Sequence, residues 1–384
     1  MDTYICPICG NSDQRSIGYR KGKPYCRKCL TFRGEEAKEY KSFPKKISFS
    51  LAYELSDEQK ELSAQLVENY KAGINSLVYA VCGSGKTEIV LGAINYALQC
   101  GEKVGFAIPR RDVVIELSER IGGIFNKNTV TCVYGGHTDN LYADIVMLTS
   151  HQLYRYNNYF DLLIMDEIDA FPFNGNEVLE SFFEKSCRKN YILMSATPSE
   201  QIKKKFTQDG FAVLELFTRF HNSPLPVPEI VCKPKGILLI KLIEYLKEFL
   251  GNKKSVFVFA PTIEICEEIF NFLSLVIKGG NYVHSKRENR GKIISEFRDG
   301  KYRYLVTTAV LERGVTVKGL QVIIYLANHN VYSKGTLIQI SGRAGRKKED
   351  PKGRVIYLAN EKTKEMQESI TEIERANKNL QSLF

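Results

Sequence analysis

The sequence predicts an α/β protein with two tandem domains, each a parallel β-sheet flanked by helices, behind a small N-terminal module. Short apolar runs alternate with helical patterns from about residue 51 to 220, and the alternation restarts near residue 231. Such alternation is typical of parallel sheets, because each crossover between parallel strands needs a helix. Four cysteines gather in the first 30 of 384 residues. We therefore place the three parts at 1–50, 51–222 and 223–384.

A proline-rich segment separates the two predicted domains. Residues His221–Ile230, "HNSPLPVPEI", carry three prolines at every second position. Proline lacks the backbone N–H that a helix interior or a central strand requires. We interpret this segment as the linker.

The chain is basic, and its charge is uneven. It holds 54 Lys+Arg against 44 Asp+Glu, a net charge of +10, of which +6 lies in the first 46 residues. This excess favours an anionic partner such as nucleic acid. The most apolar stretch, Gly236–Gly251, is interrupted by charges at helical spacing, which predicts an amphipathic helix rather than a membrane span. With no secretory signal at Met1, we expect a cytoplasmic protein.

A phosphate-binding loop is predicted at Ala80–Thr87, "AVCGSGKT", between an apolar strand and a helical pattern. It fits G-x-x-x-x-G-K-S/T with alanine in the first position. The glycines let backbone N–H groups turn towards phosphates, and the helix N-terminus adds a favourable dipole. Lys86 would reach the β- and γ-phosphates, and the Thr87 hydroxyl would ligate Mg²⁺. The residues expected to hold ATP here are Gly83, Ser84, Gly85, Lys86 and Thr87.

Acidic residues follow a second apolar strand, in "DLLIMDEIDAF". We expect Asp166 to hold Mg²⁺ and Glu167 to orient and deprotonate the attacking water. A further strand ends in Ser195-Ala196-Thr197, where α/β sheets bind ligands.

The N-terminal cysteines have the spacing C-x2-C…C-x2-C, with 16 residues between the pairs. This pattern predicts a structural Zn²⁺ site, because four thiolates fill a tetrahedral shell. The expected ligands are Cys6, Cys9, Cys26 and Cys29. The basic residues around them could contact nucleic acid or simply be solvated. The other six cysteines lie among apolar neighbours, and we expect them to be buried.

The order of the motifs AxxxxGKT, DExD, SAT and QxxGRxGR resembles that of superfamily 2 helicases and translocases. The resemblance runs from Leu51 to about Asn360 and implies two RecA-like domains with ATP in the cleft between them. It implies that Ser195 and Thr197 couple hydrolysis to movement. It also implies that Gln59 reads adenine and that Gly314 joins the nucleotide site.

The stretch "QISGRAGRK", Gln339–Lys347, allows two interpretations. Arg343 and Arg346 would lie one helical turn apart and face the same way, with Gln339 one turn earlier. In the family arrangement they would act on the γ-phosphate from the second domain, as arginine fingers. The alternative is a basic patch on a polyanion, which Lys347 and Lys348 would join.

Family motifs that touch the nucleic-acid backbone also have counterparts at strand ends. Hydroxyls, histidines and arginines there suit phosphate and sugar contacts, which carry no sequence information. We expect salt-sensitive binding of a single strand. The candidate residues are Arg110, Arg111, Thr149, Ser150, His151, His284, Thr307 and Thr308.

The cysteine module joined to this motor resembles the ComFA family of late-competence ATPases. The match lies in "YICPICG", "MDEIDAFPF", "LERGVT" and "QISGRAGR". The resemblance implies an ATPase stimulated by single-stranded DNA that helps to pull transforming DNA through the membrane channel. Its partners would resemble ComFC and DprA, at the inner face of the membrane, and it could be an oligomer. Ala80 and Thr316 depart from generic helicase motifs, which bears on strand separation more than on ATP hydrolysis.

Three alternatives remain open from the sequence. The first is a replication-restart or repair DNA helicase resembling PriA, although that family carries its cysteines within the second motor domain. The second is an RNA helicase of the DEAD-box type, which would favour DEAD over the DEID found here. The third is a zinc scaffold without enzymatic activity, which would need neither Lys86 nor Glu167.

Overall fold

The computed structural model describes residues 4–44, 49, 51, 53–81, 83–169, 172–173, 175–196, 200–217, 219, 223–308, 317–345, 350 and 352–381. The chain divides into two compact units. The first contains Met1–Ala80 and Lys86–Leu216, and the second contains Phe217–Phe384 together with the short stretch Val81–Gly85.

The first unit is built on a seven-stranded sheet with the order β5-β6-β4-β7-β8-β3-β9. All of its neighbouring strands are parallel. The strands are β3 (Ser76–Ala80), β4 (Val104–Ile108), β5 (Val130–Val133), β6 (Ile145–Thr149), β7 (Phe160–Met165), β8 (Cys187–Ser195) and β9 (Ala212–Leu216). The helices are α1 (Asp57–Lys71), α2 (Lys86–Gln99), α3 (Arg111–Ile124), η2 (Ser150–Arg155), α4 (Glu177–Ser186) and α5 (Glu200–Gln208).

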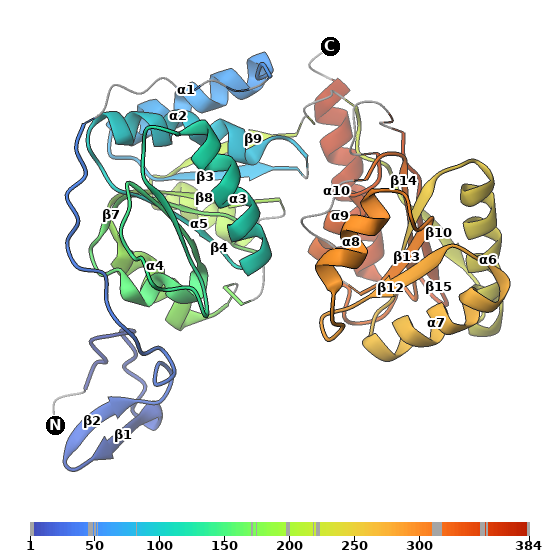
Figure 1. Ribbon diagram of the computed structural model, residues 1–384, viewed down its shortest axis with the longest axis horizontal. Helices are drawn as coiled ribbons and strands as arrows, with labels where there is room; N and C mark the ends of the chain where they lie inside the picture. The colour runs from blue at the N-terminus through green and yellow to red at the C-terminus, as the bar shows by residue number, and fades with distance from the viewer. Residues whose placement is uncertain are drawn as a thin grey trace. The chain divides into compact units, whose positions relative to one another are not determined.

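Helices cover both faces of this sheet, with α4 opposite α1 and α2 (Figure 1). Side chains of α1, α2 and α3 pack into one apolar cluster on one face. Side chains of α4 and η2 pack into a second cluster, which also takes in the N-terminal cysteines. Every residue of β3, β4, β6 and β7 is buried, as expected for parallel strands covered on both sides.

The second unit is built on a six-stranded parallel sheet with the order β10-β15-β14-β11-β13-β12. Its strands are β10 (Glu229–Cys232), β11 (Ser255–Phe259), β12 (Gly280–Val283), β13 (Tyr304–Thr307), β14 (Leu320–Tyr325) and β15 (Val355–Ala359). Its helices are α6 (Lys235–Gly251), α7 (Ile263–Val276), α8 (Arg290–Arg298), α9 (Lys334–Ser341) and α10 (Lys364–Gln381). The predicted class, two parallel α/β sheets in tandem, is therefore confirmed.

The N-terminal module is a 3₁₀ turn, η1 (Gln14–Ser16), and an antiparallel hairpin of β1 (Ile17–Arg20) and β2 (Lys23–Cys26). The proline-rich linker ends earlier than predicted, because Glu229 and Ile230 already belong to β10. This strand lies at the sheet edge, where prolines directly before it break no ladder.

The scattered cysteines differ in burial, and the most apolar stretch of the chain forms a helix. Of the six scattered cysteines, Cys266 is buried, but Cys100 is exposed just beyond α2, which corrects the expectation of general burial. The amphipathic stretch forms α6. Within the described residues, no helix combines the length and the apolar character that a bilayer span requires.

Candidate nucleotide and nucleic-acid site

The loop between β3 and α2 has the backbone that a phosphate cradle needs. Gly83 and Gly85 adopt φ values of +83° and +82°, which favour glycine. Lys86 is the first residue of α2, and Thr87 lies in its first turn. The helix N-terminus therefore opens directly at the loop, where its free N–H groups suit an anion.

Asp166 and Glu167 follow directly after β7. The amide of Asp166 extends the ladder to the carbonyl of Ala107 in β4, at 3.0 Å. Its Oδ1 accepts a hydrogen bond of 2.8 Å from the amide of Glu167. Glu167 has φ +59°, a left-handed conformation that costs a non-glycine residue about 1–3 kcal/mol. Such strain is typical of functional sites, and here it falls on the predicted general base.

The third strand end at this edge belongs to β8. Its last residue, Ser195, is buried and donates a hydrogen bond of 2.9 Å to Oδ1 of Asp169. The amide of Ile168 donates to the carbonyl of Met194 at 3.2 Å. The acidic motif and the Ser-Ala-Thr motif are thus fastened to each other. Asp169 is a partner that the sequence analysis did not identify, and Thr197 lies outside the described residues.

The sheet order brings these motifs together. β7, β8 and β3 are neighbours and parallel, so their carboxyl ends share one edge. Adjacent strands lie about 4.8 Å apart, so the β3 and β7 ends are separated by about 10 Å. That distance suits a triphosphate with a cation between the loop and the carboxylates.

Gln59 caps the N-terminus of α1 together with Ser56. Its Oε1 accepts from the amide of Ser56 at 2.9 Å, and the Ser56 hydroxyl accepts from the Gln59 amide at 3.2 Å. This reciprocal capping box fixes the buried Gln59 side chain at the helix N-terminus. The recognition of adenine by Gln59 stays a prediction.

The arginine motif follows α9 rather than lying within it. Gln339 is in the helix, which ends at Ser341 with Gly342 as C-cap, so Arg343 lies in the following turn. Whether Arg343 and Arg346 lie one helical turn apart therefore stays a prediction. Gln339 and Arg343 are both buried. Arg346, Lys347, Lys348 and Gly314 lie outside the described residues.

A buried arginine that precedes the linker, Arg219, holds this turn. Arg219 is 1% exposed. Its Nη1 donates to the carbonyl of Gly345 at 2.9 Å. Its Nη2 donates to the carbonyls of Gly342 at 2.8 Å and Ala344 at 3.2 Å. A guanidinium presents several donors in one plane, so one side chain fixes three carbonyls of the loop that carries Arg343. This contact joins residues more than 120 positions apart, and no local pattern predicts it.

Three hydroxyls, those of Ser341, Tyr357 and Ser369, form a chain of contacts at the C-terminal end of α9. The Ser341 hydroxyl lies 2.9 Å from that of Tyr357, which lies 3.2 Å from that of Ser369 in α10. Burial raises the pKa of Tyr357 to about 12, so its hydroxyl stays protonated at neutral pH. The loop of Arg343 therefore starts from a helix end fastened to β15 and α10.

The predicted nucleic-acid residues of the first unit lie after β4 and β6, two neighbouring strands. Arg110 pairs with Asp112 at 2.6 Å, and the Arg111 guanidinium lies 4.5 Å from the ring centre of Tyr134. Thr149 and Ser150 are buried, whereas His151 is exposed. At these strand ends, accessible polar groups come mainly from Arg111 and His151.

In the second unit, the predicted residues lie at the ends of the neighbouring strands β12 and β13. His284 is 5% exposed, and its Nε2 lies 2.9 Å from Oε1 of Glu267. Thr307 is buried and donates to the carbonyl of Thr308 at 3.1 Å. These side chains fix the strand ends, and Thr308 is more accessible.

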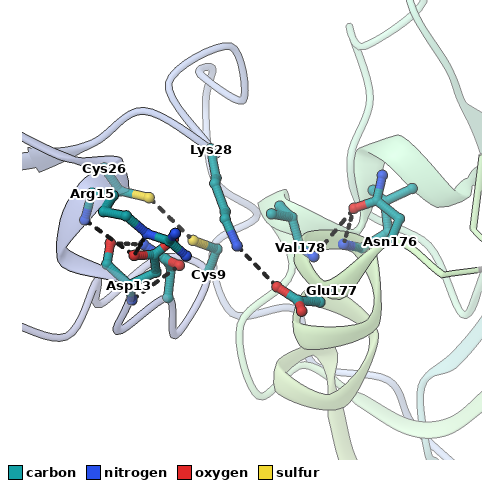
Figure 2. Close-up of polar contacts among 10 residues, drawn as sticks. Cys9, Asp13, Arg15, Cys26, Lys28, Asn176, Glu177 and Val178 are labelled. Carbon is teal, nitrogen blue, oxygen red and sulfur yellow. Dashed lines mark hydrogen bonds and ion pairs between the residues drawn. The ribbon is translucent and has the colours of Figure 1, made fainter.

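The four N-terminal cysteines form one cluster. Their sulfurs lie within 4.8 Å of one another, and those of Cys6 and Cys29 are 3.6 Å apart. The sulfurs of Cys9 and Cys26 are 3.7 Å apart (Figure 2). Sulfurs at ~2.3 Å from one tetrahedral zinc ion would be about 3.8 Å apart. The donor set therefore fits zinc with all four positions filled.

The ionisation of the cysteines supports the same fit. Burial raises the pKa of Cys9 to about 11 and that of Cys29 well above its ordinary value. Burial also acts on Cys26, but hydrogen bonds from the backbone amides of Cys29 and Lys28 outweigh it and lower its pKa. A bound cation would stabilise the Cys9 and Cys29 thiolates, which burial disfavours.

The module is docked on the first unit. Lys28 pairs with Glu177 at the start of α4, at 2.9 Å (Figure 2). Lys185, at the other end of α4, donates to the carbonyls of Pro7 and Ile8 at 2.7 and 3.0 Å. In the connector, the Phe32 ring stacks on His151, with centres 6.2 Å apart. The module is thus tied to both ends of α4 and to the start of η2.

Comparison with known families defines the class of protein. Residues 58–205 match the DEAD/DEAH box helicase family, and residues 239–348 match the helicase conserved C-terminal domain. The chain is therefore an ATP-hydrolysing enzyme of the helicase type, and the scaffold alternative is excluded.

Two curated relatives narrow this class. The competence protein ComFA of Bacillus subtilis is 34% identical over 97% of this chain and 86% of its own length. ComFA of Streptococcus pneumoniae is 31% identical over 97% of this chain and 90% of its own length. The chain belongs to the ComFA family of competence proteins.

Solved structures of low sequence identity share the fold. Yeast Dbp5 bound to RNA and ADP BeF3 has a TM-score of 0.63 at 17% identity, over 84% of this chain and 91% of Dbp5. RecG bound to a three-way DNA junction has a TM-score of 0.62 at 21% identity, over 86% of this chain and 47% of RecG. These neighbours support two RecA-like units.

Proposed function

We propose that the protein is an ATP-driven translocase of single-stranded DNA that helps to import transforming DNA during natural competence. The observation that carries the proposal is the shared strand edge of the phosphate loop, Asp166-Glu167 and Ser195, in a chain of the ComFA family. Hydrolysis at such an edge supplies the free energy for directed movement. The competence role follows from the family.

In the proposed hydrolytic step, Lys86 and the loop amides bind the β- and γ-phosphates. Thr87 and Asp166 would hold Mg²⁺, which would supply positive charge to the phosphates. Glu167 accepts a proton from water as the water oxygen bonds to the γ-phosphorus. The bond from phosphorus to the β,γ-bridging oxygen breaks, leaving ADP and inorganic phosphate.

We further propose that Arg343 and Arg346 stabilise charge on the γ-phosphate, with Gln339 beside them. The motif order supports this role, and so does the loop, because Arg219 fixes its main chain. A pre-positioned guanidinium stabilises a transition state without reorganising during the reaction. A polyanion-binding patch would need no such anchoring.

The strand-end residues of both units would follow the DNA backbone. Contacts by Arg110, Arg111, His151 and Thr308 would be independent of base sequence. Partners resembling ComFC and DprA, and work at the inner face of the membrane, are proposed from the family resemblance alone. Zinc is proposed to be structural, because four sulfurs leave no open position.

The test is the rate of ATP hydrolysis with no nucleic acid, single-stranded DNA, single-stranded RNA and duplex DNA of equal length. We expect single-stranded DNA to stimulate about tenfold or more, and RNA clearly less. Lys86→Ala is the control for contaminating ATPases. Equal stimulation by RNA would contradict the choice of DNA. Efficient unwinding of forked duplexes would favour the restart-helicase alternative.

A further inference from the structure

The β1–β2 hairpin of the cysteine module has two chemically different faces. The register pairs Ile17 with Cys26, Gly18 with Tyr25, and Arg20 with Lys23. Successive side chains of a strand point to opposite faces, so Ile17 and Cys26 share the buried face. The pairs Gly18–Tyr25 and Arg20–Lys23 share the other face.

That other face carries unpaired positive charge. Between residues 14 and 34 the chain has no acidic residue. Arg15 is paired with Asp13 and Lys28 with Glu177. By contrast, within the described residues no acidic side chain pairs with the exposed cations of the hairpin, which are Arg20, Lys21, Lys23 and Arg27.

The arrangement of these cations is unfavourable without an anion. Arg20 and Lys23 lie directly opposite each other across the strands, and like charges in such pairs are destabilising. Arg27 continues the same alternation, since its amide still donates to the carbonyl of Ser16, at 2.8 Å. Three cations therefore line one face of a narrow ribbon, which suits a polyanion that spans several charges.

An aromatic ring lies among these cations. A Cβ placed on Gly18 would meet Cζ of Tyr25 at 2.5 Å, so the Tyr25 ring lies across the glycine. The ring is half-buried and has Arg20 and Lys23 next to it along the ribbon. Basic side chains around an aromatic platform are the combination that binds single-stranded nucleic acid, because bases stack while phosphates are neutralised.

We propose that this outer face, formed by Arg20, Lys23, Tyr25 and Arg27, is a second binding surface for single-stranded nucleic acid. The proposal rests on the proposed function, in which the motor moves along such a strand. Single-stranded nucleic acid is favoured over an anionic membrane because the face carries no aliphatic side chain, whereas membrane-binding surfaces need apolar groups beside the charges.

The docking of the module makes this surface part of the first unit. Phe32 stacks on His151, which is predicted to contact the nucleic-acid backbone. Lys28 and Lys185 join the module to α4. A strand bound near His151 therefore has a continuous protein surface leading to the module. Such a surface would keep hold of DNA while the motor resets.

The test uses the full-length zinc-loaded protein and a fluorescent single-stranded oligonucleotide of about 30 thymidines, with anisotropy measured over a salt series. The variant Arg20→Ala/Lys23→Ala/Arg27→Ala should raise Kd about tenfold or more. The slope of log K against log salt should fall by about 2, since each phosphate contact on a single strand contributes about 0.7. Tyr25→Ala should raise Kd severalfold, and Tyr25→Phe should restore binding.

The matched control removes three lysines that already have acidic partners, Lys60→Ala/Lys71→Ala/Lys241→Ala. It should leave Kd and the salt slope unchanged within about twofold. Zinc content and Tm are measured for every variant, and the arginine and lysine changes are on exposed side chains that should not unfold the module.

The outcomes separate this proposal from the proposed function. If single-stranded DNA stimulates wild-type hydrolysis but the triple variant binds DNA like wild type, the second surface does not exist. If the triple variant loses binding to anionic vesicles and keeps DNA binding, the surface serves a membrane and the proposal is overturned. If wild-type hydrolysis does not respond to DNA, the proposed function itself fails.

Discussion

The two units of the motor share one architecture and differ at the ends of their strands. In the first, β3, β7 and β8 end in a phosphate loop, two carboxylates and a serine bonded to Asp169. In the second, His284 comes directly after β12, Thr307 is the last residue of β13, and the arginine loop follows α9. The fold alone therefore does not determine the chemistry, because the side chains at the strand ends differ.

The units also differ in how their functional loops are held. In the first, the main chain does this: the amide of Asp166 extends the sheet, and Glu167 adopts a left-handed conformation. In the second, one buried side chain that precedes the linker, Arg219, holds the arginine loop. Single substitutions should consequently affect chemistry in the first unit and positioning in the second.

The largest effect is expected at the proposed base. Glu167→Gln should lower ATP turnover by about 10²-fold or more, because loss of a general base typically costs that much. ATP binding, measured with a fluorescent nucleotide, should be retained. Lys86→Ala should lose both binding and turnover. Normal turnover by Glu167→Gln would remove Glu167 from the mechanism.

The next largest effect is expected at Arg219, the side chain that holds the arginine loop of the second unit. Arg219→Met should lower kcat about tenfold with little change in the KM for ATP, because the loop loses its position while the phosphate loop is intact. Arg219→Lys should recover part of the rate. The control is Arg303→Met, which removes an arginine that donates to the carbonyl of Leu250 at the end of α6. Equal losses of kcat and of Tm in both variants would mean that Arg219 acts only on stability.

A smaller effect on hydrolysis is expected from Ser195→Ala. The change removes the 2.9 Å bond to Asp169 and should lower ATP turnover only severalfold. The distance travelled per ATP should fall more, since the bond joins two motifs proposed to couple hydrolysis to movement. Displacement of streptavidin from biotinylated DNA measures translocation, and dividing it by the ATP consumed gives the ratio of movement to hydrolysis. An unchanged ratio would contradict the coupling role.

The smallest effect on the motor is expected from the cysteine module. Cys6→Ser or Cys26→Ser should lose one zinc ion per chain by elemental analysis, while the two sheets remain folded by circular dichroism. Metal content equal to that of wild type would rule out the site.

The sequence predicted those features that depend on short spacings. The phosphate loop, the acidic strand end and the cysteine pairs are each contained in a few consecutive residues, and the structure places each at a strand end or in one cluster. The alternation of strands and helices predicted both sheets for the same reason.

Features that depend on tertiary contacts could not be predicted in this way. Ser195 meets Asp169 across two strand ends, and Arg219 meets carbonyls more than 120 residues away. α9 ends at Ser341, before the first arginine of the motif, and the spacing of Arg343 and Arg346 stays a prediction because Arg346 lies outside the described residues.

The arginine loop of the second unit is proposed to supply charge to ATP hydrolysis, not a patch for DNA. The two roles are separated by measuring hydrolysis and single-stranded DNA binding for Arg343→Ala and Arg346→Ala. We expect unchanged Kd for DNA and for ATP, with kcat lowered about 10³-fold or more, as for other arginine fingers. Loss of DNA binding with hydrolysis retained would contradict this proposal and assign the loop to the nucleic acid.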